Sequence, residues 1–131
     1  MKRLMVVFIS IVLLLVTYQA FAKDYVITKK AGDYTVQIII GKNPPVTGIN
    51  RMEIAISDEK GSAVTDAKVS IDYGMPAMPG MGPMNYKNDA SLKGNQYLAS
   101  LNFSMSGPWF INIKITRTGK TQLVKLNVDV K

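Results

Sequence analysis

The sequence has neither cysteine nor histidine among its 131 residues. Without these side chains the protein forms no disulfide, no thiolate or imidazole metal site, and no catalytic arrangement built on a cysteine nucleophile or a histidine base. Any metal ion must therefore bind to methionine thioethers, carboxylates, backbone carbonyls or water. Hydrophobic residues make up 47% of the chain, an ordinary share for a folded domain. The absences thus restrict the chemistry of the protein and not its ability to fold.

Acidic residues are few: there are 9 Asp and Glu against 16 Lys and Arg, for a formal net charge of +7. The basic residues are dispersed and make no continuous stripe with interleaved aromatics, so we expect no binding to nucleic acid. Four of the carboxylates fall in expected turns, away from any nucleophile or base pattern: Asp58, Glu59, Asp66 and Asp89. We therefore do not expect an enzyme.

The N-terminus has the three parts of a secretory leader. A basic pair at residues 2–3 precedes a helical apolar run at residues 4–16, and residues 20–22 form a small-x-small motif. The run is too short to cross about 30 Å of hydrocarbon comfortably, which favours a signal peptide cleaved after Ala22 over an uncleaved anchor that tethers the protein to the membrane. We expect a periplasmic or secreted protein with no stable membrane insertion after cleavage.

The remaining residues, 23–131, are expected to form one domain made of strands. Apolar residues alternate with polar ones at period two, and no segment has a convincing helical stripe. Clusters of Gly, Pro, Asn and Asp separate the alternating segments, and residues 74–88 are expected to be a loop. The alternating segments are 34–40, 51–57, 68–73, 97–103, 109–116 and 124–130. About seven or eight short antiparallel strands predict an all-β, immunoglobulin-like β-sandwich, with a small barrel as the second choice.

Strand parity also predicts which residues point inward and which meet at one end. If successive strands reverse direction, then Met105, Trp109, the loop after Tyr73 and the loop at residues 43–45 gather at one pole of the sandwich. The side chains expected in the core include Ile54, Ile71, Leu101, Ile111, Ile113 and Leu126.

The most unusual segment is a methionine repeat with a spacing of three: Met75, Met78, Met81 and Met84. Its interspersed prolines exclude a helix and favour polyproline II, which places residues three apart on one side at about 9 Å. Thioether sulfur is a soft neutral donor that selects Cu(I) or Ag(I) over hard ions. In this conformation two of the methionines reach one ion and three in a straight row do not, so we expect a bend or a further ligand from Met105. Trp109 is a candidate to cover a monovalent ion with its ring face.

Two other interpretations of this segment remain open. Methionine is a flexible side chain that fills gaps, and in the second interpretation the loop closes the end of the sandwich around Trp109 and Phe103 without any ligand. An exposed soft patch that contacts a partner protein is the third interpretation, in which the chain is a noncatalytic periplasmic interaction module.

Several motifs together resemble the YtkA-like/FixH-like domain family. They are the segment at residues 48–54, the Met-Pro-x-Met pattern within residues 75–84, and the later Gly107-Pro108-Trp109. The resemblance covers about residues 33–130 and implies an exported or membrane-tethered immunoglobulin-like domain. It also implies a role in copper handling, with a metal-efflux protein or a copper-oxidase assembly protein as partner. A metal-homeostasis accessory, acting as carrier or sensor for Cu(I) or Ag(I), is the function that the sequence favours.

Overall fold

The computed structural model describes residues 24–131, so the expected signal peptide, residues 1–22, lies outside the described residues. No helix in the described part of the chain is both long and apolar enough to cross a membrane. The described chain contains the following strands: β1 (Tyr25–Ala31), β2 (Tyr34–Ile40), β3 (Gly48–Ser57), β4 (Lys68–Met75), β5 (Met84–Asp89), β6 (Ser91–Lys93), β7 (Gln96–Phe103), β8 (Gly107–Arg117) and β9 (Lys120–Val130).

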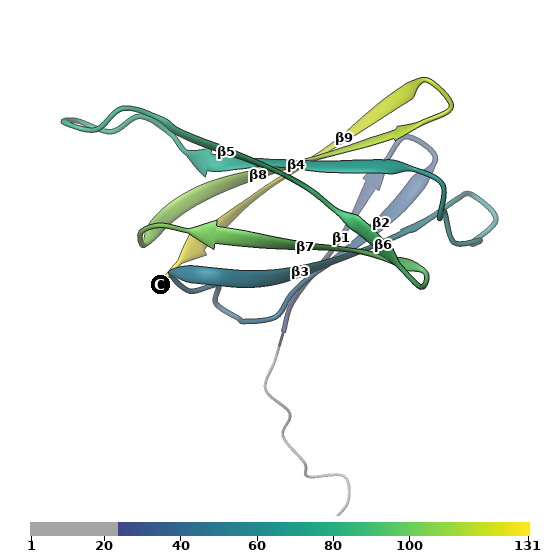
Figure 1. Ribbon diagram of the computed structural model, residues 1–131, viewed down its shortest axis with the longest axis horizontal. Coiled ribbons are helices and arrows are strands. Elements are labelled where there is room, and N and C mark those ends of the chain that lie inside the picture. The colour runs from purple at the N-terminus through teal and green to yellow at the C-terminus, as the bar shows by residue number, and fades with distance from the viewer. Residues whose placement is uncertain (1–23) are drawn as a thin grey trace, which may run out of the picture.

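The strands form two antiparallel sheets packed face to face, as the sequence predicts for an immunoglobulin-like sandwich (Figure 1). One sheet has the order β1-β2-β3-β7-β6 and the other the order β5-β4-β8-β9. The chain crosses from the first sheet to the second between β3 and β4, returns between β5 and β6, and crosses again between β7 and β8. The chain reverses direction at the first and last of these crossings, whereas β5 continues through Ala90 into β6 in the same direction.

The core lies between the two inner faces, because every second residue of the long strands points inward. Strand β3 shows this alternation from Asn50 to Ile56, and β9 shows it from Val124 to Val130. The side chains expected inside are all buried: Ile54, Ile71, Leu101, Ile111, Ile113 and Leu126. Met52, in the middle of β3, is also fully buried and belongs to this core.

Two strands were not expected from the sequence. Strand β1 is an edge strand whose residues are mostly exposed, and β5 exposes most of its six residues as well. An edge strand that buries few side chains has little hydrophobic alternation, so the pattern that reveals the central strands is missing. The expectation that residues 74–88 form a loop is wrong for this reason, since β5 pairs with β4 from Met75↔Met84 to Ser70↔Asp89.

The expected gathering of loops at one pole is confirmed. Gly48 pairs with Phe103 at the start of β3, and Gly107 pairs with Val130 at the end of β9. The loop between β2 and β3 reaches the same end, because the Lys131 backbone N–H donates to the Pro45 carbonyl at 2.9 Å. The hairpin between β4 and β5 projects beyond the sheets on this side (Figure 1).

Candidate metal centre

The methionine repeat forms the tip of the β4–β5 hairpin, and we call residues 75–84 the methionine hairpin. Met78 and Met81 face each other across a tight turn, and each backbone N–H donates to the other's carbonyl at 3.0 and 2.9 Å. Pro79 and Gly80 occupy the two corners, with Gly80 at φ 81°. A proline followed by a residue with positive φ is the requirement of a type II turn.

This geometry replaces the polyproline II conformation that the sequence favours. The same prolines that exclude a helix also suit a turn, and two backbone hydrogen bonds stabilise the turn whereas polyproline II has none. The spacing of three then places the methionines opposite one another, because they lie at equal distances in sequence on either side of the Pro79–Gly80 bond. Met78 is the partner of Met81, and Met75 is the partner of Met84.

The pairing across the hairpin arranges the four methionines as two cross-strand pairs. Directly opposite residues of an antiparallel pair lie on the same face, with Cβ atoms about 4.5–5.5 Å apart. Methionine has three rotatable side-chain bonds, so two such sulfur atoms can turn toward one ion. The pair distance is shorter than the roughly 9 Å of the extended alternative, and the donor set of soft neutral sulfur suits Cu(I) or Ag(I).

The tip pair, Met78 and Met81, is the more accessible of the two. Met81 is 41% exposed, and Met78 is half-buried against the core. Met81 is therefore the most exposed methionine of the hairpin.

The pair of methionines at the base of the hairpin, Met75 and Met84 (the base pair), packs against other parts of the sandwich. Met75 is only 2% exposed, and a Cβ added at Gly107 would meet its methyl carbon at 2.8 Å. Met84 Sδ lies 3.8 Å from the hydroxyls of both Tyr86 and Ser104, which are 3.4 Å from each other. A ligand role for either residue requires these contacts to be given up.

Gly74, directly before the hairpin, allows the close strand approach that pairs Met75 with Met84. A Cβ at Gly74 would overlap the carbonyl oxygen of Met84. Strands β4 and β5 can approach this closely only because Gly74 has no side chain. The start of the methionine hairpin is therefore set by a backbone contact, and its tip by the turn.

Trp109 does not lie open to the hairpin tip. Its side chain is 1% exposed and packs in an aromatic cluster with Tyr73, Tyr86 and Phe103, at ring-centroid distances of 6.1, 6.1 and 5.1 Å. Its Nε1–H donates to the backbone carbonyl of Met105 at 2.9 Å. These contacts agree with the packing interpretation of Trp109, while a cation–π role stays a prediction.

Met105 lies at the same pole, in the connection between β7 and β8, and is half-buried against the core. Tyr86 and Ser104 were not predicted from the sequence to be neighbours of the methionines. Tyr86 is two residues after Met84, so it shares the face of Met84 once β5 is recognised as a strand. The position of Tyr86 beside Met84 could have been predicted only by identifying β5 as a strand.

The opposite pole has a different chemistry. It carries an open groove of about 490 Å³ lined by residues of both charges, including Asp33, Glu59, Lys60 and Lys120. Within residues 24–131, no group of three or more carboxylate, imidazole or thiolate side chains is arranged to hold a metal ion.

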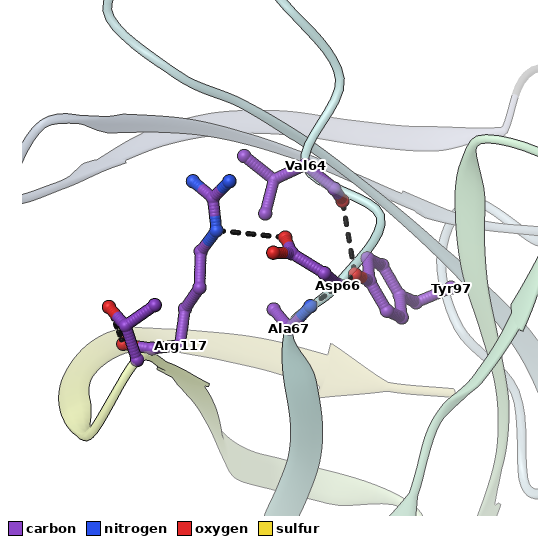
Figure 2. Close-up of polar contacts among 6 residues, drawn as sticks. Val64, Asp66, Ala67, Tyr97 and Arg117 are labelled. Carbon is purple, nitrogen blue, oxygen red and sulfur yellow. Dashed lines mark hydrogen bonds and ion pairs between the residues drawn. The ribbon is translucent and has the colours of Figure 1, made fainter.

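Hydrogen bonds and one ion pair close this second pole (Figure 2). The Tyr97 hydroxyl donates to the Val64 carbonyl at 3.0 Å and accepts from the Ala67 N–H at 3.1 Å. Arg117 Nε lies 2.8 Å from Asp66 Oδ1, a close ion pair whose angle is not that of a hydrogen bond. The polar groups here are occupied in joining the β3–β4 connection to β7 and β8.

Comparisons with known proteins place this sandwich in a family. A search of curated proteins finds no match to the chain. Among solved structures, the fold is similar to the PmoD soluble domain from Methylocystis sp. ATCC 49242 (Rockwell), with a TM-score of 0.53 and 13% sequence identity. The alignment covers 79% of this chain and 96% of that domain, and at this identity it shows the fold alone. The model of the YtkA-like family matches residues 28–114, and the chain belongs to that family.

Proposed function

We propose that the protein is an exported accessory of metal homeostasis that binds Cu(I) or Ag(I) through the methionine hairpin. The observation that carries the proposal is the direct pairing of Met78 with Met81 across the turn. Two thioethers on one face, at the most exposed part of the hairpin, form a soft donor set that a turn alone does not need. The leader-like residues 1–22 support export, and membership of the YtkA-like family agrees with it.

The role we propose is noncatalytic. An accessible pair of thioethers suits reversible binding and transfer of a soft ion, as a carrier or sensor requires. A metal-efflux protein or a copper-oxidase assembly protein is the class of partner that would give or take the ion. Met105 is the secondary candidate for a third ligand, since it is half-buried at the same pole.

A protein-interaction module is the second candidate function. The methionine hairpin has no charged residue from 75 to 84, and its tip projects beyond the sheets (Figure 1). An uncharged apolar projection of this kind suits insertion into a complementary groove on another protein. This alternative uses the same residues but needs no metal.

The test is a competition titration of the protein, purified after export, with Cu(I) in the presence of a Cu(I) chelator and with Ag(I) by calorimetry. We expect saturable binding of both soft ions and no appreciable binding of Mg²⁺ or Ca²⁺, because a neutral thioether offers little to hard ions. Binding of neither Cu(I) nor Ag(I), together with capture of a partner by the metal-free protein, would favour the interaction module instead.

A further inference from the structure

The chain has 8 methionines and no cysteine, so thioether sulfur is its softest and most readily oxidised nucleophile. The structure divides the methionines sharply by access. Met81 is 41% exposed, whereas Met75 and Met52 are 2% and 0% exposed. A small polar oxidant therefore reaches the hairpin tip long before it reaches the core.

We propose that Met81, with Met78 beside it, is a site of reversible oxidation to methionine sulfoxide by peroxide, and that this modification turns off metal binding at the methionine hairpin. The second half of the proposal rests on the proposed function. The first half, the modification site itself, rests only on the burial and contacts of the methionines.

The chemistry needs no other residue of the protein. A sulfur lone pair attacks one oxygen of hydrogen peroxide, an S–O bond forms and the O–O bond breaks. The departing hydroxide takes the proton of the transferred hydroxyl and leaves as water. Sulfur loses two electrons, peroxide gains them, and methionine sulfoxide reductases reverse the change.

Local contacts rank the remaining methionines below the tip. Met84 Sδ lies within 3.8 Å of two hydroxyl donors, Tyr86 and Ser104, and a hydrogen bond to sulfur draws on the lone pair that attacks peroxide. Met75 has its methyl group against Gly107 and little access to solvent. We infer the order Met81 first, then the half-buried Met78 and Met105, Met84 later, and Met75 with Met52 last.

Oxidation and metal binding compete for the same electrons. The lone pair that would coordinate Cu(I) or Ag(I) is the one that attacks peroxide, so an occupied site resists oxidation. Sulfoxide replaces a soft donor with a polar oxygen, which suits soft ions poorly. By linkage, an ion that protects the thioether must bind more weakly to the oxidised protein.

The experiment exposes the exported protein to dilute hydrogen peroxide and follows each methionine by mass spectrometry. Tryptic cleavage after Lys68 and Lys87 gives one peptide that contains the whole methionine hairpin, and fragmentation locates each added oxygen. We expect Met81 to react at least about tenfold faster than Met75 and Met52, because burial keeps the oxidant from the other two sulfur atoms. Similar rates at Met81 and Met75 would overturn the modification site.

Urea provides the control, because the unfolded chain exposes every methionine. The order should disappear there, and an order that persists in urea would show that local sequence and not the fold sets the rates, which also overturns the proposal. Met81→Leu should remove the fastest phase and leave the rate at Met52 unchanged.

The metal arm uses Ag(I), which unlike Cu(I) does not cycle with peroxide. Bound Ag(I) should slow oxidation of Met78 and Met81, and the oxidised protein should lose at least about tenfold in Ag(I) affinity, with recovery after treatment with sulfoxide reductase. Binding of Ag(I) without protection would overturn the switch. If Ag(I) does not bind at all, the proposed function fails while the oxidation order still tests the modification site by itself.

Discussion

The two poles of this sandwich use their polar and sulfur-containing groups in opposite ways. At the pole closed by Tyr97 and Arg117, hydroxyl, guanidinium and carboxylate groups contact one another or the backbone and join three parts of the chain. At the methionine pole, Met75 is buried and Met81 is exposed, and the hairpin between β4 and β5 extends past the sheets (Figure 1). The groups that a fold does not need for its own stability are the better candidates for function.

The largest effect is expected from a change in the core that both poles share. Ile113 lies in the middle of β8 and is fully buried. Ile113→Ala should lower the free energy of unfolding by about 2–5 kcal/mol, because it removes buried methyl groups and leaves a cavity. Urea unfolding measures the change, and a variant as stable as the parent protein would contradict the assigned core.

A smaller loss of stability is expected when a tyrosine is replaced by phenylalanine, and this loss should differ between the two poles. Tyr97→Phe leaves the buried Val64 carbonyl and the Ala67 N–H without their partner and should cost about 1–3 kcal/mol. Tyr86→Phe is the matched control, since Tyr86 is 38% exposed and water can replace its hydroxyl contacts, so we expect a change within about 0.5 kcal/mol. Equal losses in the two variants, measured by urea unfolding, would remove the contrast between the poles.

The two methionine pairs should also differ in stability. Met75→Leu places a branched side chain where the Met75 methyl reaches Gly107, and should cost up to about 1.5 kcal/mol. Met81→Leu changes an exposed side chain at the tip and should be nearly neutral, within about 0.5 kcal/mol. Thermal or urea unfolding compares them, and a larger loss from Met81→Leu would assign the tip to packing.

The smallest effect concerns a carboxylate pair at the charged pole. A hydrogen bond that the protonated Glu59 carboxyl donates to Asp33, together with the negative charge of Asp33, raises the pKa of Glu59 above its ordinary value. A raised pKa in the folded state means that folding is favoured when Glu59 is protonated, and that this benefit is lost as the pH rises through its folded pKa. Glu59→Gln should therefore slightly increase stability at neutral pH and change little in acid, as paired unfolding curves at the two pH values would show. A decrease at neutral pH would contradict this sign.

Much of the fold could be predicted because the central strands bury one face. The alternation of Ile111, Ile113 and Ile115 against polar neighbours determines both the strand and the side that faces the core. The edge strands β1 and β5 gave no such signal. Lys29 and Lys30 place charges on the edge strand β1, which discourages pairing with another chain. The same charged residues interrupt the apolar alternation by which a strand is recognised.

The methionine segment could be singled out from the sequence, but its conformation could not, and the ligand role of its methionines stays a prediction. The spacing of three agrees equally with polyproline II and with mirror positions about a two-residue turn. Recognition of β5 decides between them, because the pairing of Met84 with Met75 closes the hairpin. The packing of Met75 and Met84 depends on Gly107 and Ser104, which come from distant parts of the chain, and on Tyr86, which shares a face of β5 with Met84.

The central claim is that the tip pair binds the soft ion and the base pair does not. The direct test compares two double variants by competition titration with Cu(I). The tip variant combines Met78→Leu and Met81→Leu, and the base variant combines Met75→Leu and Met84→Leu. We predict that the tip variant loses at least about tenfold in affinity, or roughly 1.4 kcal/mol, while the base variant stays within about threefold of the parent protein. Equal affinities in the tip variant and the parent protein would contradict this account of the methionine hairpin.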